Sequence, residues 1–146
     1  MLKELLWMLV TSALGTLGFA MLLHAPKRAW LTASIIGGVG YMIYWGLLLL
    51  GWPDPAALFT GVLAATVLAQ FAARKMRMIA TIFVTLAIIP SVPGLGLYRA
   101  MSYLGQGMNS AGAKEGVSAM ISVGMIALAI GVGSFLARRV FSLHKR

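Results

Sequence analysis

A proline- and glycine-rich motif between residues 88 and 99 is the part of this chain best suited to bind a small ligand. Pro90 and Pro93 each remove a backbone donor, and Gly94 and Gly96 tolerate conformations that other residues resist. A helix interrupted there exposes carbonyl groups at the end of its first half and N–H groups at the start of its second half. Those N–H groups attract anions, and many secondary transporters hold a substrate carboxylate in this way. A simple proline kink in a packing helix is the alternative interpretation.

Arg99 places a positive charge about 1.5 helical turns beyond the start of the second half-helix. Its side chain can face the predicted cavity and pair with an anion, or it can extend to the membrane interface. The sequence leaves these two positions of Arg99 open.

The chain has few other groups that could do chemistry. Its three acids, Glu4, Asp54 and Glu115, fall at the ends of apolar segments or in a loop, so we expect no carboxylate in mid-bilayer to relay protons. It has no cysteine, and His24 and His144 lie among basic residues at helix ends. These features argue against a hydrolase and against a small multidrug-type antiporter. We therefore expect no enzyme activity, no metal and no cofactor, and any proton-coupling acid would come from another chain.

The composition is that of an integral membrane protein. Of the 146 residues, 60% are hydrophobic and 10% are charged, whereas soluble domains are about one quarter charged. The formal net charge of +9 comes from small basic clusters between apolar stretches. This pattern is typical of membrane loops and argues against nucleic-acid binding.

The apolar stretches predict an all-α transmembrane fold in a single domain over residues 1–146. A crossing needs about 20 apolar residues, which gives five predicted helices at about 5–23, 29–51, 55–73, 78–97 and 117–137, with a long glycine-rich loop over 98–116. The fourth helix carries the proline motif. Because residues 78–89 cover only roughly 18 Å as a helix, against a hydrocarbon core of about 30 Å, the break near Pro90 and Gly94 is expected near the bilayer midplane.

The basic residues predict an orientation. One side of the membrane carries the clusters at 27–28, 74–77 and 138–139 together with Lys145 and Arg146, and the other side carries only Lys3, Arg99 and Lys114. By the positive-inside rule the richer side is cytoplasmic. The N-terminus is therefore expected outside and the C-terminus inside.

Small residues at intervals of four mark two helix faces. The third predicted helix carries Gly61, Ala65, Ala69 and Ala73, and the fifth carries Ala129, Gly133 and Ala137. Such stripes let neighbouring backbones approach closely in a membrane. They predict tight helix packing.

Two motifs together resemble a known family. They are Gly18-Phe19-Ala20-Met21 followed by Ala25-Pro26-Lys27-Arg28-Ala29, and Ile88-Ile89-Pro90-Ser91-Val92-Pro93-Gly94 followed by Tyr98 and Ala100-Met101. Their order and spacing, and the chain length, are similar to the small YjjB-type subunit of the bacterial threonine/serine exporter (ThrE-like) family. The resemblance covers nearly the whole chain.

The resemblance implies a multi-pass protein of the bacterial inner membrane that corresponds to the C-terminal half of fused exporters. Its partner would be a second membrane subunit that resembles their N-terminal half. Family members are associated with export of threonine and serine, and split pairs with dicarboxylates such as succinate. The resemblance does not carry a substrate-binding role over to Arg99, which is a candidate because of its charge alone. The candidate substrate-binding residues are Pro90, Ser91, Pro93, Gly94, Gly96, Tyr98 and Arg99.

The sequence thus favours a subunit of a secondary exporter for small carboxylate-bearing metabolites, with alternating access around the broken helix. Transporter folds are commonly built from two related halves around a midplane site, and this chain resembles one such half. The other interpretations are a membrane scaffold or assembly subunit that does not transport, and a homo-oligomeric channel.

Overall fold

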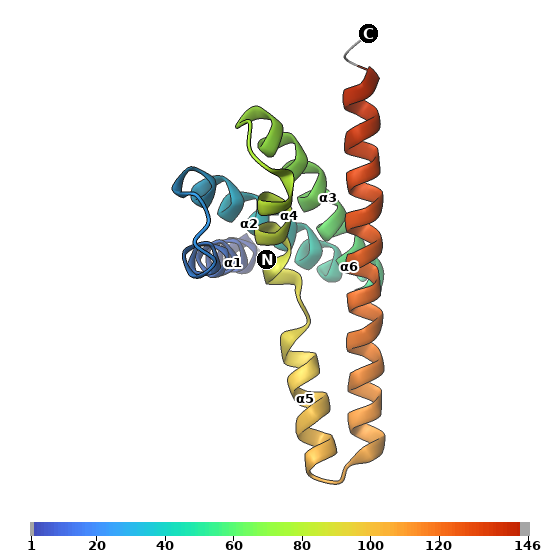
Figure 1. The fold of residues 1–146 in the computed structure, drawn as a ribbon. Helices are drawn as coiled ribbons and strands as arrows, with labels where there is room; N and C mark the ends of the chain where they lie inside the picture. The colour runs from blue at the N-terminus through green and yellow to red at the C-terminus, as the bar shows by residue number, and fades with distance from the viewer. Residues whose placement is uncertain (1, 144–146) are drawn as a thin grey trace.

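The computed structural model describes residues 2–143, and this part of the chain is helical with no strand. His144, Lys145 and Arg146 of the sequence arguments lie outside the described residues. The elements are α1 (Leu2–Leu22), α2 (Lys27–Leu49), α3 (Asp54–Lys75), α4 (Ala80–Ile88), the 3-10 turn η1 (Ile89–Ser91), α5 (Gly94–Gly105) and α6 (Asn109–Leu143). Figure 1 shows their arrangement.

The predicted all-helical membrane class is confirmed. Within the described residues, α2, α3 and α6 are long and apolar enough to cross a bilayer, and the bent pair formed by α4–η1 and α5 makes a fourth candidate span. The apolar part of α1, Leu6–Leu22, is shorter. The structure therefore supports three or four spans by length and composition, and it leaves the fifth predicted crossing as a prediction.

The small-residue stripes pack helices together, as predicted. Gly61 on α3 lies so close to α2 that an added Cβ would fall 2.8 Å from the Gly40 carbonyl oxygen and 2.9 Å from the Tyr44 Cβ. On the other side of α3, a Cβ on Gly133 of α6 would fall 3.0 Å from the Thr66 Cγ2. Helix α3 thus packs between α2 and α6.

The predicted loop over residues 98–116 is wrong. Helix α5 continues to Gly105 and α6 already begins at Asn109, so α6 spans 35 residues where the sequence predicted a helix over 117–137. Of the glycines that suggested a loop, Gly107 lies in the short turn with φ 75°, whereas Gly112 serves helix packing: a Cβ on Gly112 would fall 2.7 Å from the Leu104 Cγ and 3.1 Å from the Ala100 carbonyl oxygen. The result is an α5–α6 hairpin that extends beyond the other helices (Figure 1).

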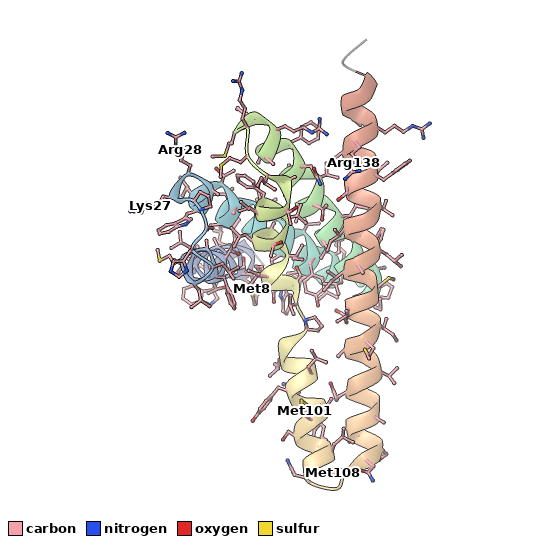
Figure 2. All side chains as sticks on the ribbon, in the orientation of Figure 1. Met8, Lys27, Arg28, Met101, Met108 and Arg138 are labelled. Carbon is pink, nitrogen blue, oxygen red and sulfur yellow. The ribbon has the colours of Figure 1, made fainter. Side chains whose placement is uncertain are left out.

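Several basic residues gather at the end of the molecule opposite this hairpin. Arg28 and Arg138 lie toward one end, whereas Met101 and Met108 of the hairpin lie toward the other (Figure 2). The connection between α3 and α4, which follows Arg74 and Lys75 (Figure 1), lies at the same end as Arg138 (Figure 2). Basic residues from the three clusters thus lie toward one end of the fold, and the orientation in the membrane stays a prediction.

Candidate functional site

The predicted interruption of the fourth helix is present at the proline motif. Helix α4 ends at Ile88, η1 covers Ile89–Ser91, and Val92 is extended with φ −67° and ψ 128°. Pro93 follows with φ −77° and ψ 53°, and the Gly94 N–H donates to the Val92 carbonyl oxygen at 2.8 Å, which makes an inverse γ-turn. The segments on either side are bent by 52°. We call residues 90–94 the break.

A cavity of about 250 Å³ lies beside the break. Its walls come from four parts of the fold: residues 90–96 around the break, Tyr41 and Tyr44 on α2, Asp54 and Leu58 on α3, and Ser122 on α6. One water molecule occupies about 30 Å³ in the liquid, so this cavity has the volume of about eight water molecules. The break cavity is therefore large enough for a small polar ligand.

Five of the predicted site residues line this cavity, namely Pro90, Ser91, Pro93, Gly94 and Gly96. Tyr98 and Arg99 do not line it: both are exposed on α5, and Tyr98 keeps 69% of its surface exposed. The structure thus brings together the predicted site residues of the break and Gly96. The side chains of Tyr98 and Arg99 lie outside this cavity. Any contact of Tyr98 or Arg99 with substrate stays a prediction.

The sequence reasoning missed the polar wall opposite the break. The Tyr44 hydroxyl donates a hydrogen bond of 2.6 Å to the Asp54 Oδ1, and the Tyr41 ring lies 5.6 Å from the Tyr44 ring. From the sequence we placed Asp54 at the end of an apolar segment and expected no role for it in the site. The available signal was an acid between two prolines, Pro53 and Pro55, in a chain with only three acids.

The turn between α2 and α3 brings this pair together. Gly51 adopts φ 82°, which favours glycine, and the Trp52 N–H donates to the Leu47 carbonyl oxygen at 3.1 Å. Pro53 is extended and α3 begins at Asp54, with a proline in its first turn. The chain reverses tightly, so the start of α3 lies against the end of α2.

The electrostatics of the cavity are set by one charged side chain. Of the described residues, Asp54 is the only acid that lines it, and no lysine, arginine or histidine does so. In the same part of the chain, no group of three or more His, Cys, Asp or Glu could hold a metal ion. The chemistry of this site is therefore that of one carboxylate, nearby hydroxyls and backbone groups.

A second cavity of about 310 Å³ adjoins the break. It is lined mainly by α1, including Met8, Thr11 and Ser12, and it shares Tyr41 and Pro90 with the break cavity. These two residues therefore lie between the two hollows. A rearrangement at Pro90 would change both.

A family model described as "Threonine/Serine exporter, ThrE" matches residues 8–137 of this chain. The chain belongs to the threonine/serine exporter family. The matched region contains both motifs that suggested the resemblance, the break and every residue lining the break cavity. This is a family of membrane transport proteins, so the predicted resemblance is confirmed.

A curated relative is longer than this chain. An uncharacterized protein of Haemophilus influenzae is 28% identical to this chain over an alignment of 146 residues. The alignment covers 97% of this chain and 49% of the relative. This exporter-family chain thus spans about half the length of the relative. No solved structure matches it.

Proposed function

We propose that this chain is a subunit of a secondary exporter of small carboxylate-bearing metabolites, either threonine and serine or a dicarboxylate such as succinate. The observation that carries the proposal is the polar break cavity, in a chain that belongs to an exporter family. Broken helices in secondary transporters bind substrates at their half-helix ends. The break cavity is the candidate position of the substrate.

The first turn of α5 supports binding of a substrate carboxylate. The Gly94 N–H is used by Val92 and the Leu97 N–H by Pro93. The N–H groups of Leu95 and Gly96 have no carbonyl partner within α5, because they belong to its first turn. Both residues line the break cavity, where the positive end of the helix dipole favours an anion.

Packing of the two half-helices supports alternating access. Helix α4 packs on α2 and α3, whereas α5 packs on α6. The γ-turn at Pro93 joins these two packing units with a short irregular segment. A hinge at element ends of this kind can open a cavity to one side and then to the other.

The transporter proposed here needs a second membrane subunit. This chain spans about half of its curated relative, and transporters often bind substrate between two halves. The α5–α6 hairpin exposes large apolar side chains, including Leu95, Met101 and Met120. We propose that a chain resembling the N-terminal half of fused exporters covers this hairpin, and that Tyr98 and Arg99 act at that shared wall.

We also propose five crossings in the bacterial inner membrane, with the N-terminus outside and the C-terminus inside. The position of Arg28 and Arg138 at one end of the fold supports this orientation (Figure 2). The chain has no cysteine, so single cysteines can report it. The variant Gly107→Cys should react with an impermeant reagent added outside intact cells, and reaction only after lysis would reverse the proposed orientation.

The function is tested by metabolite release from cells that lack both subunits. Cells that regain this chain and its partner together should release threonine, serine or succinate faster than cells that regain either chain alone. Equal release from cells with and without the pair would favour a scaffold. Release restored by this chain alone would favour a homo-oligomeric channel.

A further inference from the structure

Four turns between helices share one backbone geometry and differ in the residue at one position. Each has the paired backbone hydrogen bonds of a Schellman motif, in which the first residue beyond the helix cap has a positive φ. This residue is Gly51 between α2 and α3 and Gly107 between α5 and α6, with φ 82° and 75°. After α1 and α3 it is His24 and Arg77, both with φ 52°. Any side chain strains the backbone in this region, and such strain is common at functional sites.

Both strained turns lie at the basic end of the fold. The basic pair at 27–28 follows His24, and the pair at 74–75 precedes Arg77 (Figure 2 labels Lys27 and Arg28). The acids of the chain lie near the starts of α1, α3 and α6, away from these turns, namely Glu4, Asp54 and Glu115. The charge at the basic end therefore favours an anionic partner.

A cavity of about 270 Å³ lies between the first strained turn and α4. The turn contributes residues 23–26 to its lining. Helix α4 contributes Thr81, Ile82, Thr85 and Leu86. Because α4 begins at Ala80, this second wall starts just after Arg77. The cavity thus has His24 in one wall and follows Arg77 directly with the other.

The backbone of both turns is anchored to the core. Ala25 of the first turn and Met78 of the second pack against the same hydrophobic cluster. The Trp30 Nε1 also donates to the Ala25 carbonyl oxygen at 2.7 Å. His24 and Arg77, each next to one of these anchors, are exposed. The fold therefore presents both side chains to the surroundings from fixed positions.

Apolar side chains beside the turns indicate a lipid as the anionic partner. Leu22, Leu23 and Ile79 keep 71%, 55% and 68% of their surface exposed. Leu23 also lines the cavity, together with Ile82. A soluble anion would gain nothing from these contacts, whereas a phospholipid carries a phosphate and acyl chains on one molecule. Basic pockets between membrane helices bind lipid headgroups in this way.

We propose that the cavity beside His24 binds the headgroup of an anionic phospholipid. The Arg77 guanidinium and the His24 imidazole donate hydrogen bonds to its phosphate, for which a guanidinium is well shaped. The acyl chains lie against Leu23 and Ile82. A lipid held there connects the α1–α2 turn to α4 and stabilises the folded chain. This inference goes beyond the proposed exporter function and does not depend on it.

The test measures the thermal unfolding midpoint of the full chain, purified in a neutral detergent together with any chain that co-purifies. Phosphatidylglycerol should raise the midpoint by about 5 °C more than phosphatidylcholine with the same acyl chains. An equal rise with the two phospholipids contradicts the inference. Because no transport is measured, this result is separate from the outcome of the exporter proposal.

The double variant His24→Gly, Arg77→Gly should lose at least half of the rise that is specific to phosphatidylglycerol. Without phospholipid it should unfold at the wild-type temperature or above, because glycine relieves the strained φ at both positions. A double variant that keeps the full rise contradicts the inference. A lower midpoint without phospholipid also contradicts it, because the two side chains would then serve the fold.

Two controls separate this site from a general effect of charge. Arg138→Gln removes a charge at the same end of the fold, from α6, which does not line the cavity. This variant should keep the rise, and a loss equal to that of the double variant overturns the proposed site. Inorganic phosphate at matched ionic strength should leave the wild-type midpoint unchanged. A rise equal to that with phosphatidylglycerol would assign the site to a soluble anion and contradict lipid binding.

A measurement of cavity access keeps the inference testable if the double variant does not fold. Thr81→Cys places a thiol in the cavity wall of a chain that has no cysteine. Its reaction with an uncharged thiol reagent, taken relative to exposed Ser110→Cys, should be slower by about threefold or more in phosphatidylglycerol than in phosphatidylcholine. The same ratio in the two lipids would contradict occupation of the cavity.

Discussion

Cells that carry the double variant Pro90→Ala, Pro93→Ala with the partner subunit are expected to lose most of their export, by at least about tenfold. A proline inside a helix costs about 3 kcal/mol, which corresponds to roughly a hundredfold change in an equilibrium constant. With alanine, the N–H groups at positions 90 and 93 can donate to carbonyls one turn earlier, and α4 and α5 can form one helix. A continuous helix would close the break cavity and remove the free N–H groups of Leu95 and Gly96.

The matched control for this variant is Pro26→Ala. Pro26 precedes α2 at a helix start and does not line the break cavity, so its replacement should leave export close to wild type. Membrane levels of both variants must match wild type in the same cells. Unchanged export from the double variant would contradict alternating access at the break.

Gly61→Ala should destabilise the protein and reduce export together. A Cβ there would overlap the Gly40 carbonyl oxygen at 2.8 Å and the Tyr44 Cβ at 2.9 Å. Backbone atoms cannot yield locally, so α2 and α3 must separate, at a cost of about 1–3 kcal/mol. The shift would also move Tyr44 away from Asp54, whose hydrogen bond is 2.6 Å long.

Gly46→Ala is the control for this change, because Gly46 also lies in a helix but a Cβ added to it would have no neighbouring atom within 4 Å. It should keep or slightly raise stability, since alanine favours a helix interior by roughly 0.5–1 kcal/mol over glycine. The measurement is the thermal unfolding midpoint of both variants in detergent, alongside export. Equal midpoints would show that α2 and α3 are not in close contact at Gly61.

Features that depend on local chemistry were predictable from the sequence. Prolines inside a helix, such as Pro90 and Pro93 in the fourth predicted helix, interrupt it because proline lacks an N–H. The stripe at Gly61, Ala65, Ala69 and Ala73 indicates a packing face, because residues four apart share one side of a helix. The membrane class was predictable too, because it depends on composition and not on how the helices pair.

Features that depend on how helices pair were not predictable. Gly112 was one of the glycines that suggested a loop, since glycine also suits loops, and only its close approach to Leu104 and Ala100 shows that it packs one helix against another. The cavity combines residues of α2, α3 and α6 with the break. Their meeting is set by the register of long helices, which no local pattern encodes. The role of Asp54 in the cavity wall was not predictable for this reason.

The central claim is that transported substrate occupies the break cavity beside Ser91. The most direct test uses an active Ser91→Cys variant, assembled in liposomes with a cysteine-free partner. Saturating substrate should slow its reaction with a thiol reagent, while a non-transported sugar should not, and exposed Ser110→Cys should react at the same rate in all conditions. An active transporter whose cysteine at position 91 reacts equally fast with and without substrate would contradict the account.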